Sequence, residues 1–126
     1  MAYERPVAPV LIVEDDEGVR GAFAALLASE GYRVMEAADG LEALELLRAA
    51  ETLPCLILLD LMMPRMSGWD FCAVQKRDER LLSIPVVVVS ADPLAARATR
   101  MGAAAVLQKP ADPEQLLALV ERHRAG

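Results

Sequence analysis

The sequence is poor in cysteine and lysine, and it has no long apolar run. Its two cysteines, Cys55 and Cys72, lack the spacing of a metal site and are too few for a disulfide framework, which favours a reduced, cytoplasmic compartment. Because no apolar run approaches about 18 residues, no membrane-spanning helix is expected. The N-terminal residues Met1–Arg5 lack the basic-then-apolar order of a signal peptide.

Positive charge is also in deficit, because 13 Lys and Arg stand against 19 Asp and Glu, giving a net charge of −6. Nucleic acids and anionic membranes are bound through basic surfaces, so neither is expected as a main partner. Apolar residues, in contrast, make up 55% of the chain, which is enough to build a core. The length of 126 residues predicts a single domain over residues 1–126, with its core at about 9–124.

Short apolar runs alternate with helical patterns along the chain. The continuous runs at 10–13, 56–59 and 86–89 are typical of strands buried on both faces of a parallel sheet. The segments 33–37 and 104–108 are more polar or weaker, so we expect them to form the two edge strands. Together these patterns predict five strands.

Five helices are expected to follow the strands. The first has Val19, Phe23, Leu26 and Leu27 on one face and ends at Gly31. The other four are predicted from capping signals, which begin at Asp39, Ser67, Asp92-Pro93 and Asp112-Pro113. The order (βα)₅ predicts an α/β fold, a doubly wound five-stranded parallel sheet with helices on both faces.

Chemically active side chains follow four of the predicted strands. Glu14 and Asp15 follow the first strand and Asp60 the third, while Ser90 ends the fourth and Lys109 follows the fifth. Ligands of such sheets bind beyond the carboxyl ends of the strands. We therefore expect these five residues to share one crevice, although they are far apart in the sequence.

Three carboxylates in one crevice require compensation. Like charges about 4 Å apart repel by roughly 4 kcal/mol at an effective dielectric of about 20. A divalent cation and the Lys109 ammonium would together cancel the charges of Glu14, Asp15 and Asp60. Mg²⁺ is favoured because it takes oxygen ligands and accepts a phosphoryl oxygen, with Mn²⁺ as the alternative ion. The set predicts phosphoryl transfer, with Asp60 as the nucleophile that forms an acyl phosphate.

Each of these residues alone has a simpler structural interpretation. Acids after a strand are usually helix caps, and Asp16 and Glu17 are interpreted as cap and first-turn residues. Ser90 alone would be a turn or cap residue, and Lys109 a solvated lysine of an edge strand. Their coincidence at strand ends favours the functional interpretation. So does the choice of lysine at 109 in a chain with two lysines among 13 basic residues.

Four segments spread over nearly the whole chain match the motifs of one family. They are residues 10–16, residues 59–64 with Gly68, residues 89–91 and residues 108–110. In these motifs the sequence resembles a response-regulator receiver domain of two-component signalling. The resemblance implies a flavodoxin-like fold with strand order 2-1-3-4-5.

The resemblance also implies a role for each site residue. Asp60 would accept a phosphoryl group from a histidine kinase or a histidine phosphotransfer protein. Asp15 would bind Mg²⁺ directly together with Asp60, Glu14 would act through water, and the backbone carbonyl of Met62 would be a further ligand. Ser90 would hydrogen-bond the phosphoryl group and pull its loop inward.

Further implied roles concern the residues around this centre. Lys109 would pair with a phosphoryl oxygen, and Ala91 would lie in the phosphoryl-binding loop. The peptide bond between Lys109 and Pro110 would be cis. Pro64 and Gly68 would have structural roles in the segment after the phosphoacceptor.

Position 106 departs from the family pattern. Receivers usually have Tyr or Phe three residues before the lysine, where the ring acts as a rotamer switch, and here that position is Val106. A valine has no ring to swing between an outward and a buried pose. We therefore expect phosphorylation to shift the Ser90 loop and the fourth helix without an aromatic gate.

Other functions agree less well with the sequence. A phosphatase of the haloacid dehalogenase type needs an aspartate two residues after the nucleophile, where this chain has Met62. A flavodoxin-like FMN binder needs a phosphate loop after the first strand, where acids would repel the phosphate. A degenerate receiver that acts only as a binding module is a further alternative, which the complete set of site residues disfavours.

The expected role is that of a phosphoacceptor, not an enzyme, which takes part in its own phosphorylation and dephosphorylation. A stand-alone receiver whose output is contact with an unidentified downstream protein is favoured, and the alternative is the receiver portion of a longer regulator.

Overall fold

The sheet at the centre of the fold has five parallel strands. The computed structural model describes residues 8–125, so the segment Met1–Arg5 discussed above lies outside the described residues. The strands are β1 (Val10–Val13), β2 (Val34–Ala37), β3 (Leu56–Leu59), β4 (Val86–Ser90) and β5 (Ala105–Gln108). Their order is β2-β1-β3-β4-β5, which confirms the predicted doubly wound sheet with β2 and β5 at its edges.

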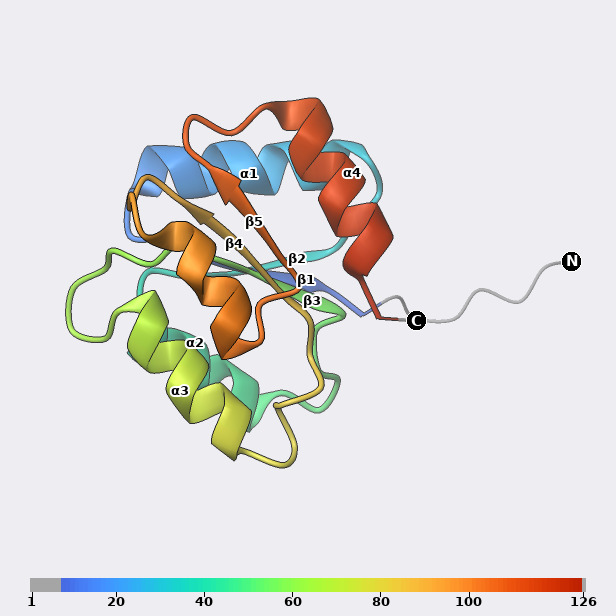
Figure 1. The fold of residues 1–126 in the computed structure, drawn as a ribbon. Coiled ribbons are helices and arrows are strands. Elements are labelled where there is room, and N and C mark those ends of the chain that lie inside the picture. Colours follow the sequence, from blue (N-terminus) through green and yellow to red (C-terminus); the bar gives the residue numbers. More distant parts are fainter. Residues whose placement is uncertain (1–7, 126) are drawn as a thin grey trace, which may run out of the picture.

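Helices cover both faces of this sheet (Figure 1). One face carries α1 (Glu17–Ser29) and α4 (Pro113–His123), and the other carries α2 (Gly40–Ala49), α3 (Gly68–Arg77) and the 3₁₀ helix η1 (Ala95–Met101). This three-layer arrangement follows from the strand order, since each crossover between parallel strands is right-handed. No helix of residues 8–125 is long and apolar enough to cross a membrane.

Most predicted helix ends are confirmed. Asp16, Asp39 and Ser67 each accept a hydrogen bond from the backbone amide three residues on, at 3.0, 2.9 and 3.1 Å. Each bond satisfies an amide that has no partner inside its helix. Gly31 follows α1 with a φ of +87°, a conformation that glycine adopts without steric cost.

The prediction of an α-helix starting at Asp92-Pro93 is wrong in type and position. The segment forms the 3₁₀ helix η1, with Leu94 at its N-cap and no side-chain cap bond. The Asp92 carboxylate instead accepts a hydrogen bond from the Leu94 amide at 2.8 Å, which closes a turn two residues long. Asp92 therefore stabilises a turn instead of capping a helix, and the helix begins later, at Ala95.

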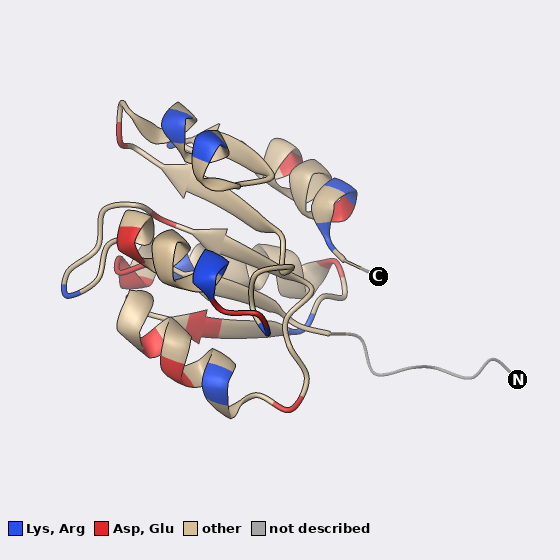
Figure 2. Cartoon of the chain, turned by 60° about the horizontal axis from the view of Figure 1, so that its bottom comes forward, with Lys and Arg blue, Asp and Glu red and all other residues tan. Residues whose placement is uncertain are grey.

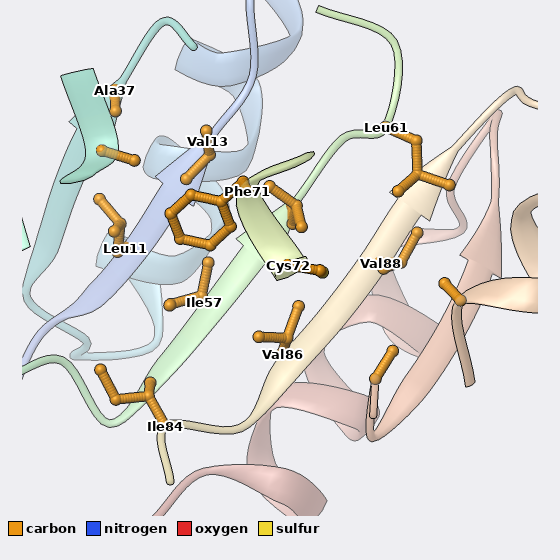
Figure 3. Packing of buried hydrophobic residues seen from close by; sticks show 14 of the residues in the cluster. Leu11, Val13, Ala37, Ile57, Leu61, Phe71, Cys72, Ile84, Val86 and Val88 are labelled. Carbon is orange, nitrogen blue, oxygen red and sulfur yellow. The ribbon is translucent and has the colours of Figure 1, made fainter. Parts of the chain in front are cut away.

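Apolar side chains fill both spaces between the sheet and its helices. Beneath α2 and α3, the fully buried Phe71 ring lies close to Leu11, Val13 and Ile57 (Figure 3). A second cluster beneath α1 and α4 includes Leu27. Charged residues lie mainly on the helices and loops, and the strands are uncharged except for the edge strand β2 (Figure 2). This segregation buries apolar area on both faces of the sheet and drives the fold.

Gly68, the first residue of α3, packs directly on the backbone that follows β3. Its amide donates to the Leu61 carbonyl at 2.9 Å, and a Cβ at this position would lie 2.2 Å from the Asp60 carbonyl oxygen. Only a residue without a side chain permits this approach. Gly68 therefore sets how closely α3 is held to the end of β3.

Replacing Gly68 with alanine should lower the free energy of unfolding. The new methyl group would meet backbone atoms, and overpacking of this kind costs about 1–3 kcal/mol. The matched control is Gly21→Ala in α1, where a Cβ meets no atom within 4 Å and the helix should gain up to about 1 kcal/mol. Urea unfolding of both variants checks this, and a Gly68→Ala protein as stable as the wild type would contradict it.

Candidate functional site

Three carboxylates gather at the carboxyl ends of the adjacent strands β1 and β3. Glu14 and Asp15 follow β1 directly, and Asp60 follows β3. Val13 and Leu59 are register partners, so both strands end at the same level. One carboxylate oxygen from each of the three acids lies within 4.8 Å of the others. Glu14 and Asp60 are 2% and 6% exposed, which places two of the three charges away from solvent.

Lys109, which follows β5, compensates part of this charge. Its ammonium donates a hydrogen bond to Glu14 and lies 3.6 Å from Asp60 Oδ2. Its position is set by the sheet, because its amide donates to the Ser90 carbonyl at 3.0 Å beyond the β4–β5 pairing. The structure thus brings together four of the five residues that the strand ends predicted, Glu14, Asp15, Asp60 and Lys109. The fifth, Ser90, is buried at the end of the neighbouring strand β4.

Asp60 is held from both sides. Its amide donates to the Val13 carbonyl at 3.0 Å, and its own Oδ1 accepts a hydrogen bond from the Leu61 amide at 2.8 Å. These contacts fix the carboxylate plane and leave Oδ2 as the oxygen nearest Lys109. A buried carboxylate oriented in this way is suited to attack an electrophile that approaches from the crevice.

Burial and neighbouring charges shift the pKa values of Glu14 and Lys109. Burial raises the pKa of Glu14 to about 7, although hydrogen bonds from Lys109 and the Asp16 amide oppose the rise and the charge of Asp60 adds to it. For Lys109, burial acts to lower the pKa, but the hydrogen bond to Glu14 and the charges of Asp60 and Glu14 outweigh it, so the pKa is raised. The ammonium therefore stays charged at neutral pH, whereas Glu14 is only partly ionised there.

Ser90 and the loop after it are tied to α3. The buried Ser90 hydroxyl accepts a hydrogen bond from the Asp92 amide at 3.1 Å, and the Asp92 carboxylate accepts one from the Trp69 indole at 3.4 Å. Ala91, between them, is exposed. These two hydrogen bonds join the end of β4 to α3.

The remaining predicted residues lie in the segments next to Asp60 and Lys109. The Lys109–Pro110 peptide is cis, the isomer that the resemblance implies. Met62 lies in the loop from β3 to α3 with 53% of its surface exposed. Pro64 lies in the same loop, and its carbonyl accepts from the Met66 amide at 2.7 Å.

Val106 is half-buried in β5 and packs against the apolar cluster of the α2–α3 face. Its side chain is therefore part of the core packing. It offers no ring that could move between two positions.

The structure adds two arginines, Arg20 and Arg65, that the sequence patterns did not predict. Arg20 donates to the Glu14 carbonyl at 2.8 Å and lies 3.4 Å from the Glu36 carboxylate, which ties α1 to β1 and β2. Arg65 pairs with Asp39 across the space between the β3–α3 loop and α2. No spacing signal could have identified either residue, because their partners are brought near only by the fold.

The donor set fits a hard divalent cation. Three carboxylates supply oxygen ligands, and the exposed Asp15 leaves an open side where water or a phosphoryl oxygen could complete the coordination. Neither sulfur nor imidazole belongs to this cluster, which favours Mg²⁺ or Mn²⁺ over softer ions.

The chain is similar to proteins of one family over nearly its whole length. Protein PilG of Pseudomonas aeruginosa is 34% identical over 117 residues, which is 90% of this chain and 85% of PilG. The DNA-binding dual master transcriptional regulator RpaA of Synechocystis sp. is 36% identical over 88% of this chain. That match covers 46% of RpaA, so the chain spans about half the length of this relative.

The fold is shared with solved structures of the same kind. The structure of the chemotaxis protein CheY4 of Vibrio cholerae superposes with a TM-score of 0.84 and 30% identity, covering 94% of this chain and 99% of CheY4. Residues 10–121 match the family described as the response regulator receiver domain. By sequence and by fold, the chain therefore belongs to the response regulator receiver domains of two-component signalling.

Proposed function

We propose that the domain accepts a phosphoryl group on Asp60 from a phosphohistidine and passes the signal on by changing its contacts with another protein. The donor would be a histidine kinase or a histidine phosphotransfer protein in the cytoplasm. The observation that carries this proposal is the buried, oriented Asp60 carboxylate between two further acids and the Lys109 ammonium. In this role the chain is a phosphoacceptor, not an enzyme acting on other molecules.

The reaction is a transfer between two side chains. An Asp60 oxygen attacks phosphorus, a P–O bond forms, and the P–N bond of the phosphohistidine breaks, with its electron pair returning to the imidazole. Lys109 is close enough to pair with a phosphoryl oxygen. When held by Asp15, Asp60 and the Met62 carbonyl, with Glu14 acting through water, Mg²⁺ would neutralise charge on the phosphoryl oxygens.

The output follows from what the phosphoryl group displaces. In the proposed switch, the Ser90 side chain would turn toward a phosphoryl oxygen on Asp60 and give up the hydrogen bond that it now accepts from the Asp92 amide. Asp92 would then lose one of its contacts, and its hydrogen bond with the Trp69 indole would carry the change to α3. The proposed output surface is therefore the segment from Ser90 through η1 to Val106. The proposed unit is one receiver domain over residues 1–126.

Phosphorylation should occur on Asp60 alone. Incubation with acetyl phosphate and Mg²⁺ should add the mass of one phosphoryl group to the intact protein, and Asp60→Asn should abolish the adduct because the amide is a poor nucleophile. Asp70→Asn is the matched control, since Asp70 is an exposed carboxylate in the first turn of α3 and should leave the adduct unchanged. An adduct that survives in Asp60→Asn would contradict the assignment.

The switch should work without an aromatic gate. Binding of beryllofluoride, a phosphoryl mimic, should change amide chemical shifts most strongly between Ser90 and Val106, and the indole N–H of Trp69 should shift because its partner Asp92 moves. Asp60→Asn should remove these changes. If the largest changes lay outside residues 90–106, the proposed route of the signal would be wrong.

A further inference from the structure

The loop from β3 to α3, residues 60–67, is held against α2 by an ion pair. Arg65 Nε lies 2.7 Å from Asp39 Oδ2, joining residues 26 positions apart in the sequence. Beside it, the Gly40 amide donates to the Met66 carbonyl at 3.4 Å. The loop carries Asp60 at one end and Met62 within it, so its position affects the proposed site directly.

Asp39 is well suited to anchor this loop. It is 5% exposed, and both of its oxygens are engaged: Oδ1 accepts from the Glu42 amide at 2.9 Å, and Oδ2 accepts from Arg65. The hydrogen bond from Arg65 lowers the pKa of Asp39, burial opposes this, and the Glu42 amide lowers it further. Asp39 thus remains an ionised, fixed acceptor that serves the loop and the start of α2 at once.

The loop is also shaped for this contact. Arg65 has a φ of +64°, in the left-handed region that non-glycine residues seldom adopt. Gly40 has no side chain where Met66 packs, because a Cβ there would lie 2.8 Å from Met66 Cγ. The ion pair therefore occurs together with an unfavourable backbone conformation at Arg65 and a close approach at Gly40. Both indicate that the surrounding structure holds the loop in one position.

We propose that Arg65 is a positioning residue, whose ion pair with Asp39 fixes the β3–α3 loop and thereby the geometry of the cation and phosphoryl site at Asp60. The inference rests on the proposed function. Arg65 would act on the site through the loop, because it lies three positions after Met62 in the same loop. The other end of the loop is fixed by Gly68, which packs on the Asp60 backbone. Without the ion pair, the loop that carries the Met62 carbonyl would lose this attachment to the start of α2.

The direction in which Mg²⁺ binding changes when Arg65 is removed separates a positioning role from a purely electrostatic one. Arg65 lies near Asp39, the N-cap of α2, and near Glu42 and Glu45 within α2, and it adds a positive charge to the loop that carries Asp60. Through charge alone, its removal would strengthen the binding of a divalent cation. Through positioning, its removal weakens that binding, because the loop no longer presents its ligand in place.

The test is a titration with Mg²⁺, followed by the amide shifts of residues near Asp60. The variant Arg65→Asn removes the guanidinium but keeps a residue that tolerates positive φ. Its dissociation constant for Mg²⁺ should rise by about tenfold, the lower end of the range for partners that orient metal ligands. Arg77→Asn removes the same charge from an exposed position on α3 and should leave the constant unchanged.

A double-mutant cycle assigns the effect to the pair. Asp39→Asn keeps an oxygen that can cap α2 but removes the charge that binds Arg65. If the pair acts as a unit, Asp39→Asn should weaken Mg²⁺ binding as well, and the double variant should bind no more weakly than Arg65→Asn. Thermal unfolding of each variant confirms that the fold is kept.

The outcomes separate the two proposals. Wild-type protein that does not bind Mg²⁺ would overturn the proposed function and this inference with it. Wild-type binding with equal or tighter binding by Arg65→Asn would overturn the positioning role alone. Additive losses in the double variant would show that Arg65 does not act through Asp39.

Discussion

The repulsion among three carboxylates is the constraint on which the rest of this structure depends. β1 and β3 end side by side, and their pairing brings oxygens of Glu14, Asp15 and Asp60 within 4.8 Å of one another. A pair of charges about 4 Å apart repels by roughly 4 kcal/mol at an effective dielectric of about 20. The fold tolerates this because Lys109 supplies one positive charge and Glu14 retains a proton over part of the pH range. In the proposed function, this concentration of negative charge would attract the divalent cation.

The neighbouring structure holds the cluster in place. Gly68 brings α3 against the Asp60 backbone, Arg20 binds the Glu14 carbonyl, and the Lys109 amide is fixed by the Ser90 carbonyl. These contacts come from every layer of the fold. The acids are therefore held in place by backbone contacts from the sheet and from the helices on both of its faces.

The sequence was sufficient to predict most of the fold and the central site, for a physical reason. Strands buried on both faces need continuous apolar runs, and the ligand crevice lies where such strands end, so Asp60 and Lys109 could be located from local patterns. The 3₁₀ helix η1 was missed because Asp92 caps a turn instead of a helix. The pair of Arg65 and Asp39 was missed because an arginine with positive φ carries no local signal and its partner is distant in sequence.

The central claim is tested most directly by the pH dependence of stability without metal. The folded-state pKa of Glu14, about 7, lies above its ordinary value, so the folded state holds an extra proton at intermediate pH. The stabilisation of the folded state by this proton is complete below about pH 4.5, and it is lost as the pH rises through about 7. The free energy of unfolding in urea should be lower at about pH 8 than at about pH 5.5. The variant Glu14→Gln, which still contains His123, should not show this fall. Addition of Mg²⁺ should restore the stability of the wild-type protein at the higher pH. Stability that is unchanged or greater at the higher pH without metal would contradict the account.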